Sequence, residues 1–555
     1  MTGRSEDGEM TGRTVADVVG ATMVRLGAGH VFGVVGSGNF HVTNALVAHG
    51  ARFVATRHEG GAATAADAYA RVSGRVGVVT VHQGCGLTNA MTGIAEAAKS
   101  RTPMVVLAAE PAASALRSNF RVDQDALARA VGAASDRVHG PDSAVADTAR
   151  AWHLAAGERR TVLLNLPLDV QAAPAEATTP PDAPAVEPPR ASDRAVATLA
   201  DLLAHAERPV FIAGRGAVGA RAEVEALAAA CGALLATSAA AKGLFAGSAW
   251  SLDVSGGFAT PLAAELIGAA DVVVSWGASL NMWTTRHGTL VGPAATVVQV
   301  DLDQAALGAH HRVDAGIVGD VRQSARAVLA ALPRKTGGYR TASVRARLAD
   351  EGRWRDVAYA DDGDAAHIDP RTASIALDDL LPRERVVAVD SGNFMGYPAM
   401  FLSVPDHRGF CFTQAFQSVG LGLASAIGAA LAAPDRLPVA ACGDGGFLMG
   451  IAELDTVCRL GLGMLIVVYD DNAYGAEVHH FGPAGHPLST VVFPDTDLAA
   501  VARGHGCAAV TVRQPGDLAA VEAWLAGPRD RPMVVDLKVA SGRPSWWLEE
   551  AFRGH

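Results

Sequence analysis

Cysteine is scarce in this sequence, and the few cysteines form no recognisable site. There are six in 555 residues, none at a spacing typical of a metal centre and most within apolar runs: Cys85, Cys231, Cys411, Cys442, Cys458 and Cys507. This usage indicates reduced core residues and excludes a small disulfide-bonded scaffold. We therefore expect a cytoplasmic protein.

Long apolar runs and charge are also limited. No apolar run reaches the roughly 18 residues that span a membrane. The first ten residues, MTGRSEDGEM, are polar and have no apolar signal-peptide core, and we expect residues 1–11 to be disordered. Only 19% of residues are charged, and the net charge is −11. This balance argues against binding to nucleic acid or to an anionic membrane.

What the sequence does contain is a repeated order of strand, glycine turn and helix. In the first part, strands are expected at 30–35, 52–56, 76–81 and 104–109, with helices at 14–26, 62–71 and 88–99. This order predicts an α/β protein built on doubly wound parallel sheets. The length suggests three domains.

The domain boundaries follow from composition. Residues 172–191 are rich in proline and residues 336–370 are charged and poorly periodic, and both are interpreted as linkers. We therefore predict an N-terminal domain at 12–171, a central Rossmann-like domain at 192–335, a third domain at 371–540 and a C-terminal segment at 541–555.

The stretch from Pro438 to Phe481 indicates a ligand site. A strand at 439–442 leads into Gly443-Asp444-Gly445-Gly446, a helix is expected at 447–460, and a strand at 464–468 leads to Asp470-Asp471-Asn472. In a parallel sheet both turns lie at the carboxyl ends of neighbouring strands, so Asp444 and Asp471 can face one point. Two carboxylates beside a glycine turn suit a divalent cation that carries a diphosphate. The alternative is two ordinary aspartates at strand ends.

A second glycine motif lies in the central domain. Gly214-Arg215-Gly216-Ala217-Val218-Gly219 has the form of a dinucleotide fingerprint. However, the next strand ends near Thr237-Ser238 without the acidic residue that would bind a ribose. Glycines that allow close packing explain the motif at least as well.

Over nearly its whole length the chain resembles the thiamine diphosphate-dependent enzymes, and more narrowly the superfamily of acetolactate synthase, benzoylformate decarboxylase and pyruvate decarboxylase. The resemblance implies a pyrimidine-binding, a central and a diphosphate-binding domain, in that order. The family motif is GDG followed by a paired NN, which here reads Asp470-Asp471. Counting back from Tyr474-Gly475 makes Asp471, not Asn472, the metal-ligand position. The implied Mg²⁺ ligands are Asp444, Asp471 and the carbonyl of Ala473.

The resemblance also implies the catalytic residues. Glu59 stands where the family has the glutamate that bonds the aminopyrimidine of the cofactor, although a helix N-terminal carboxylate would be the alternative. His82 matches a histidine of benzoylformate decarboxylase and would move protons at the substrate carbonyl. Glu477 matches an acid of pyruvate decarboxylase, and His480 can share its helix face. Strand-end or solvated roles remain open for His82, Glu477 and His480.

Further residues are expected to contact the cofactor. Val419 is in the position of the apolar residue that wedges the cofactor into its bent form, and the glycine loop that follows the strand at 76–81 ends at Asn89. The implied cofactor-binding set is Asn89, Gly392, Asn393, Val419, Gly443, Asp444, Gly445, Gly446, Asp471 and Tyr474. FAD is doubtful, because no acid–arginine pair follows Gly277-Ala278.

The expected function follows from this resemblance. It is decarboxylation of a 2-oxo acid with ligation of the resulting enamine to a second carbonyl, as in acetolactate synthase. A 2-oxo acid decarboxylase or lyase without ligation is the alternative, and a nucleotide-dependent oxidoreductase is a weaker one. By resemblance the protein is a homodimer or homotetramer, without nucleic-acid or membrane partners.

Overall fold

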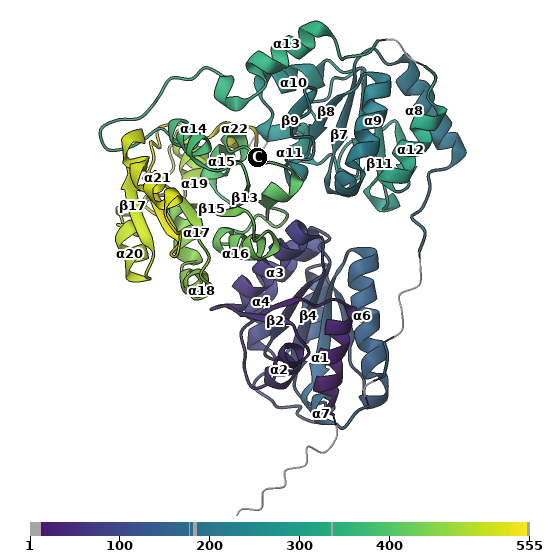
Figure 1. Cartoon of the computed structure of the whole chain (residues 1–555), viewed down its shortest axis with the longest axis vertical. Helices are drawn as coiled ribbons and strands as arrows, with labels where there is room; N and C mark the ends of the chain where they lie inside the picture. Colours follow the sequence, from purple (N-terminus) through teal and green to yellow (C-terminus); the bar gives the residue numbers. More distant parts are fainter. Residues whose placement is uncertain (1–12, 177, 181–185, 335–336, 552–555) are drawn as a thin grey trace, which may run out of the picture. The chain divides into compact units, whose positions relative to one another are not determined.

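Three parallel six-stranded sheets with interleaved helices make up the fold of this computed structural model (Figure 1). The structure describes residues 13–176, 178–180, 186–334 and 337–551, so the disorder expected for 1–11 concerns residues outside it. The strand orders are β2-β1-β3-β4-β6-β5, β12-β11-β10-β7-β8-β9 and β14-β13-β15-β16-β18-β17. The predicted fold class is confirmed. The predicted domain boundaries stay predictions.

The first sheet holds the strands expected at the N-terminal end. Its strands are β1 His30–Gly33, β2 Arg52–Ala55, β3 Gly77–Val81, β4 Met104–Glu110, β5 Ala134–Arg137 and β6 Thr161–Pro167. Strand β3 is buried along its whole length, as expected of a parallel sheet covered on both faces. The helices are α1 Val15–Leu26, α2 Phe40–Ala48, α3 Glu59–Ser73, α4 Cys85–Lys99, α5 Gln124–Ala130, α6 Ala144–Glu158 and α7 Leu168–Ala172.

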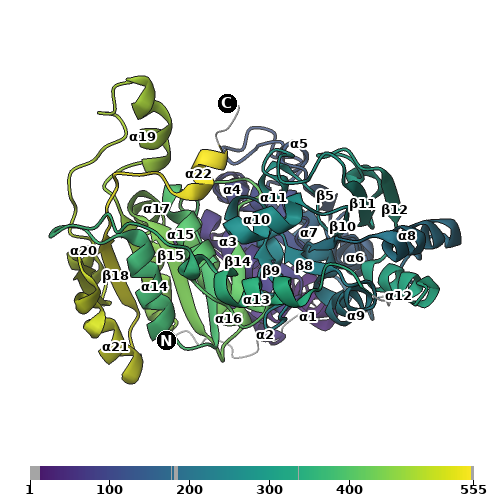
Figure 2. The same cartoon turned by 90° about the horizontal axis from the view of Figure 1, so that it is seen from above.

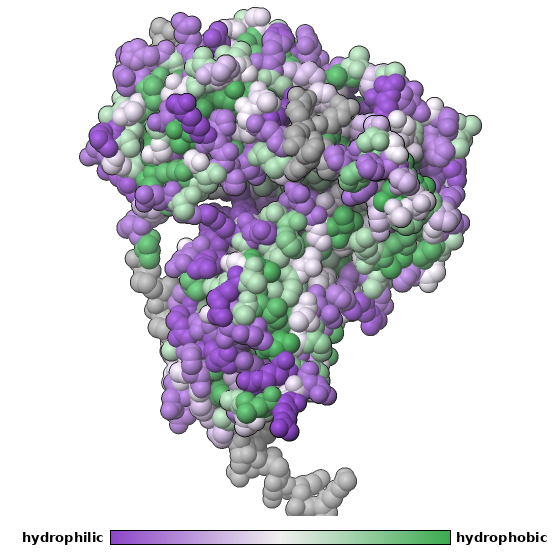
Figure 3. Space-filling model, turned by 180° about the vertical axis from the view of Figure 1, so that it is seen from behind, coloured by the Kyte–Doolittle hydropathy of each residue, from purple (hydrophilic) through white to green (hydrophobic). Residues whose placement is uncertain are grey.

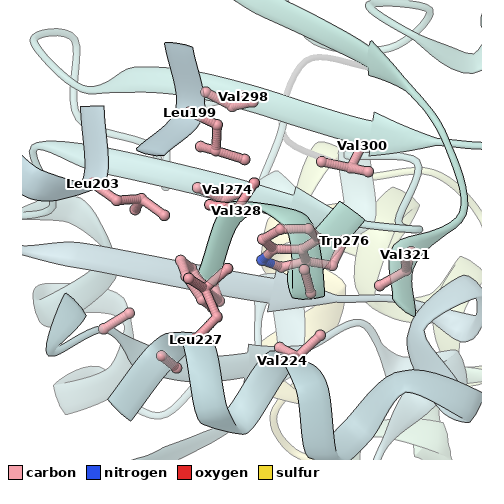
Figure 4. Close-up of a cluster of buried hydrophobic side chains, with 14 of the residues drawn as sticks. Leu199, Leu203, Val224, Leu227, Val274, Trp276, Val298, Val300, Val321 and Val328 are labelled. Atoms are coloured by element: carbon pink, nitrogen blue, oxygen red, sulfur yellow. The ribbon is translucent and has the colours of Figure 1, made fainter. Parts of the chain in front are cut away.

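The second sheet encloses an apolar core centred on Trp276. Figure 4 shows this side chain among residues of β10, β11 and helices α8, α9 and α12. The strands are β7 Pro209–Ala213, β8 Leu234–Thr237, β9 Ser251–Val254, β10 Val272–Trp276, β11 Thr296–Asp301 and β12 Ala315–Val318. The helices are α8 Asp193–His205, α9 Arg221–Cys231, α10 Pro261–Gly268, α11 Met282–Thr285 and α12 Val321–Ala331.

The third sheet contains the stretch in which the two acidic turns were expected. Its strands are β13 Arg385–Val389, β14 Phe410–Phe412, β15 Leu437–Gly443, β16 Leu465–Asp470, β17 Ala508–Val512 and β18 Met533–Lys538. The helices after the second sheet are α13 Ala342–Glu351, α14 Pro370–Leu380, α15 Gly396–Phe401, α16 Gly422–Ala432, α17 Asp444–Met449, α18 Glu453–Arg459, α19 Gly475–Phe481, α20 Leu498–Gly504, α21 Ala519–Ala526 and α22 Trp546–Ala551.

One local prediction was wrong, and one predicted linker contains a helix. The single helix expected at 447–460 is two helices, α17 and α18, because Gly450 lies between them and glycine is a poor helix former. The stretch 336–370 is more than a linker, since it contains α13. Arg347 of that helix forms two hydrogen bonds of 2.7 Å with Glu265 of α10.

The chain divides into two compact units. The first unit comprises the described part of 1–184 with residues 413–432 and 450–460, and the second unit comprises the described remainder. Within the first unit α16 packs against α3, where a Cβ at Gly428 would collide with the carbonyl of Ala65. Two short segments from the last third of the sequence therefore belong to the core of the first unit.

Over the described residues, no helix is long and apolar enough to cross a membrane. Figure 3 shows hydrophilic and hydrophobic residues interspersed on the visible face.

Candidate functional site

Glu59 opens α3 in the first unit, directly after the turn that follows β2. His58 caps the helix, its Nδ1 accepting from the backbone N–H of Gly60 at 3.0 Å. The half-buried Glu59 carboxylate accepts a hydrogen bond from the amide of Asn89 on α4, with 3.1 Å between Oε2 and Nδ2. The structure therefore brings together two residues that the sequence predicted separately.

Glu453 binds the backbone of the turn that precedes Glu59. It was not identified as a site residue from the sequence. Its carboxylate, 3% exposed, accepts from the backbone N–H groups of Arg57 and His58 at 3.1 Å each, and from the hydroxyl of Thr456. Burial raises the pKa of Glu453. The only signal was an acid in the apolar pattern of a helix, because its partners lie almost 400 positions away.

His82 follows β3 and contacts the turn after β1 that contains Gly36 and Gly38. The backbone N–H of Gly38 donates to His82 Nδ1 at 3.0 Å, and Phe120 packs edge-on against the ring at 4.9 Å. A Cβ at Gly36 would lie 2.9 Å from His82 Cγ, so only glycine allows this approach. Burial lowers the pKa of His82, although the charge of Glu59 opposes the shift.

This geometry fixes the tautomer of His82. A backbone N–H can only donate, so Nδ1 is an acceptor and the neutral ring carries its proton on Nε2. His82 and Glu59 lie around Gly86, where a Cβ would be 3.1 Å from His82 Cβ and 3.4 Å from Glu59 Oε1. The first unit thus places a hydrogen-bond donor, His82, and a carboxylate, Glu59, close to a single glycine, Gly86.

Val419 lies in the segment 413–432, which belongs to the first unit. The side chain is 38% exposed, although it is apolar. Its loop is anchored by the buried Glu96, whose carboxylate accepts from the backbone N–H groups of Ala415 at 3.0 Å and Phe416 at 2.6 Å. Arg71 balances the charge of Glu96 at 2.7 Å. An anchored loop that exposes an apolar tip is suited to contact a ligand.

The second unit contains Asp444 and Asp471. Asp444 opens α17 after β15, and Asp471 follows β16. Burial raises the pKa of Asp444 to about 8, with further contributions from the charges of Asp471 and Asp470, and burial raises the pKa of Asp471 to about 7. A nearby divalent cation would relieve this unfavourable concentration of negative charge. The donor set therefore fits the predicted metal.

The turn after β16 holds Asp471 through local backbone contacts. Its Oδ1 accepts from the N–H of Ala473 at 3.2 Å, and Asn472 adopts a left-handed conformation with φ of 54°. A Cβ at Gly475 would collide with Asp471 Oδ2. A Cβ at Gly445 would lie 2.8 Å from the ring of Tyr474, whose side chain is 38% exposed. Glycines thus bring the two acidic turns and the tyrosine close together.

The predicted diphosphate loop follows β13. Gly392 has φ of 144°, which disfavours other residues, and Asn393 is buried. A Cβ at Gly443 would lie 3.1 Å from the ring of Phe394, so this loop packs against the glycine turn before Asp444.

Glu477 and His480 lie on α19, one helical turn apart. Glu477 is exposed, and His480 is half-buried with its ring edge-on to Phe481 at 4.6 Å. Between them, burial lowers the pKa of His479, whose ring Nε2 has no hydrogen-bond partner among the described residues. The helix starts four residues after Asp471.

Lys538 is a second residue that the sequence did not reveal. Its Nζ donates to Asp470 at 2.5 Å, to Asp495 at 2.6 Å and to the carbonyl of Thr496 at 3.0 Å. This buried ammonium ties the end of β16 to a distant loop and partly neutralises the carboxylate next to Asp471. Nothing in the sequence pairs it with these partners.

Packing explains two of the three glycines of residues 214–219. A Cβ at Gly214 would collide with the carbonyl of Gly277, and a Cβ at Gly216 would lie 2.9 Å from the Cα of Gly277. The turn continues as a 3-10 helix over Arg215–Ala220.

A metal at Asp444 and Asp471 would need a backbone ligand. Among the described residues no group of three histidine, cysteine or acidic side chains could hold a metal ion. Two carboxylates with a carbonyl, such as that of Ala473, are consistent with this finding.

Comparison with known proteins gives three matching family models along the chain. They are the thiamine pyrophosphate enzyme N-terminal TPP binding domain at residues 13–130, the central domain at 196–332 and the C-terminal TPP binding domain at 390–537.

Relatives match over most of their lengths. A probable 2-ketoarginine decarboxylase of Pseudomonas aeruginosa is 32% identical over 527 residues, covering 91% of this chain and 90% of the relative. A sulfoacetaldehyde acetyltransferase of Alcaligenes xylosoxydans xylosoxydans is 29% identical, covering 82% and 81%. An acetolactate synthase large subunit of Parasynechococcus marenigrum is 29% identical, covering 93% and 86%.

Proposed function

Because the chain belongs to the thiamine pyrophosphate enzyme family, we propose that it uses thiamine diphosphate and Mg²⁺ to decarboxylate a 2-oxo acid and to join the remaining fragment to a second carbonyl. The observation that carries this proposal is the pair of carboxylates of Asp444, which is buried, and Asp471, which is half-buried, with pKa values raised to about 8 and about 7. Such a pair is suited to a cation that carries a diphosphate.

Several residues would hold the cofactor. Asp444, Asp471 and the carbonyl of Ala473 would bind Mg²⁺, and the loop at Gly392 and Asn393 would contact the diphosphate together with Gly443, Gly445, Gly446 and Tyr474. Val419 would support the bend of the cofactor from its anchored loop. The bound cofactor supplies the electron sink for decarboxylation, which no side chain can provide.

The first unit supplies the proton-transfer groups. Glu59, oriented by Asn89, would exchange a proton with the aminopyrimidine. His82, with its proton on Nε2, would donate a hydrogen bond to the substrate carbonyl oxygen and stabilise the negative charge that develops there. Glu477 and His480 would move protons to and from the substrate-derived carbon.

Simple decarboxylation is the second candidate. It is supported by the name of the relative that is 32% identical, a probable 2-ketoarginine decarboxylase, and by His82 and Glu477. The names of the other two relatives, an acetyltransferase and an acetolactate synthase, support transfer to a second molecule. A nucleotide-dependent oxidoreductase has less support, because close packing explains Gly214 and Gly216 and the next strand lacks the acidic residue that would bind a ribose.

Assembly and location are part of the same proposal. Glu59 and Asp444 are contributed by different units, and in proteins that resemble this chain the cofactor lies between two subunits, so we infer at least a homodimer. The cysteine usage supports a cytoplasmic location.

Two measurements test this function. Calorimetric titration with thiamine diphosphate and Mg²⁺ should show saturable binding, and absence of binding by the wild type would refute the proposal. A panel of 2-oxo acids, including pyruvate and 2-ketoarginine, should then be assayed for carbon dioxide and for carbon products, with and without an aldehyde acceptor. Carbon dioxide with only an aldehyde product would favour simple decarboxylation over ligation.

A further inference from the structure

Residues 545–548, which we term the C-terminal clamp, are buried in the second unit except for Trp546, which is exposed. Ser545, Trp547 and Leu548 are 2%, 6% and 2% exposed, and Trp547 and Leu548 belong to the apolar cluster around the third sheet. Figure 2 shows α22, which contains most of the clamp, beside α15. The clamp therefore contributes side chains to the hydrophobic core of this unit.

The clamp directs its polar atoms at one residue, Asn393. The hydroxyl of Ser545 and the indole N–H of Trp547 both donate to the backbone carbonyl of Asn393, at 2.7 Å and 2.8 Å. The backbone N–H of Ser545 donates to Asn393 Oδ1 at 3.1 Å. Three buried hydrogen bonds thus fix both the peptide and the side chain of a residue in the predicted diphosphate loop.

These bonds set the orientation of the Asn393 amide. A backbone N–H can only donate, so the atom facing Ser545 must be the amide oxygen. The amide nitrogen then faces the acidic turn. A Cβ at Gly475 would lie 3.2 Å from Asn393 Nδ2 and would also collide with Asp471 Oδ2. The clamp therefore presents two N–H donors on the side where the metal and the diphosphate are expected.

A glycine provides the seat for the indole ring. A Cβ at Gly396, at the start of α15, would collide with Trp547 Cδ1 and lie 3.0 Å from its Nε1. The ring of Trp283 also packs against the indole of Trp547, with 5.9 Å between the ring centroids. Because Gly396 is three residues after Asn393, the start of α15 receives the indole directly beside the predicted diphosphate loop.

We propose that Ser545 and Trp547 are positioning residues that hold the amide of Asn393 ready to donate to the cofactor diphosphate. This inference rests on the proposed function, because it assumes that the loop binds a diphosphate. The order of the loop before ligand binding does not depend on that assumption, since the hydrogen bonds are formed within the chain itself.

The first test compares the full-length wild type with the double variant S545A/W547F. The variant keeps a ring in the seat and removes two donors to Asn393. Hydrogen exchange of the ligand-free protein should increase at residues 390–396, and the affinity for thiamine diphosphate at saturating Mg²⁺ should fall about tenfold. W546F is the matched control, because the neighbouring Trp546 is 39% exposed and stacks on Arg286 instead. It should change neither measurement.

A double-mutant cycle separates positioning from general stability. If the clamp acts through Asn393, S545A/W547F should weaken binding little further in the N393A background. An equal loss in both backgrounds, or wild-type affinity in S545A/W547F, would overturn the proposal.

A second variant displaces the ring without removing a hydrogen-bonding group. G396A should also loosen residues 390–396, because its methyl group occupies the indole seat. Unchanged exchange there would contradict the clamp. A wild type that binds no thiamine diphosphate would instead refute the proposed function and the cofactor role of Asn393, while hydrogen exchange would still report on the clamp.

Discussion

At the scale of single residues, the first unit positions its reactive groups through backbone contacts. Asn89 orients Glu59, and the N–H of Gly38 orients His82. The residue types and their order along the chain revealed both candidates in the sequence. The tautomer of His82 could not be predicted, because Gly38 and His82 are 44 positions apart.

Replacement of Glu59 tests its catalytic role. Glu59→Gln keeps the shape and can still bond Asn89, but it cannot exchange a proton with the aminopyrimidine. We expect the variant to bind thiamine diphosphate with near wild-type affinity and to lose proton exchange at C2 of the cofactor by about 10²-fold or more. Proton exchange followed by NMR measures this step directly. Exchange at the wild-type rate would show that the assignment of Glu59 is wrong.

The proton position on His82 is a second prediction. In ¹H–¹⁵N spectra of protein labelled in histidine, His82 should be a neutral ring with the proton on Nε2 at pH 7, and it should titrate below the ordinary pKa of about 6.5. Burial favours the neutral form. His82→Gln assigns the signal by its disappearance. A ring protonated on Nδ1 would contradict the contact with Gly38.

At the scale of elements, most strands of the core were predictable and the helix around Glu453 was not. The strands expected at 76–81 and 104–109 agree with β3 and β4, because buried parallel strands appear as short apolar runs between turns. The helical spacing of apolar residues over 447–460 runs through Gly450 without a break, so the sequence did not reveal the division into α17 and α18. The role of α18 depends on contacts with the turn after β2, which local periodicity cannot report.

Glu453 therefore gives a prediction about how α18 stabilises the turn that precedes α3. Glu453→Gln replaces charge-assisted bonds to the N–H groups of Arg57 and His58 with weaker ones, and we expect the free energy of unfolding to fall by about 1–2 kcal/mol. Urea unfolding measures this change. Asp455→Asn on the same helix is the control, because Asp455 is 35% exposed and its ion pair with Arg57 lies at the surface. Equal losses in the two variants would argue against a special role for Glu453.

At the scale of the whole molecule, the site couples stability to pH. A carboxyl whose pKa is raised on folding stabilises the native state fully below its unfolded pKa of about 4, and this contribution is lost as the pH rises through the folded value. For Asp471 and Asp444 that loss extends up to about 7 and about 8. A bound cation should offset it, because it stabilises the ionised form.

We therefore expect Mg²⁺ with thiamine diphosphate to raise the melting temperature more at pH 8 than at pH 6. Differential scanning calorimetry at both pH values measures the difference. Asp471→Asn should reduce this pH dependence, because the amide has no charge, while it keeps an oxygen for the metal. A stabilisation that is independent of pH in the wild type would argue against a metal at these carboxylates.

The composition of the first unit has a consequence for synthesis. Its core includes residues 413–432 and 450–460, and α16 packs closely on α3, with Gly428 against the backbone of Ala65. During translation the first 184 residues leave the ribosome long before these segments are made. The apolar surface of α3 that α16 covers therefore stays exposed on the nascent N-terminal part until residue 460 has emerged. We expect chaperones to bind this surface during that interval.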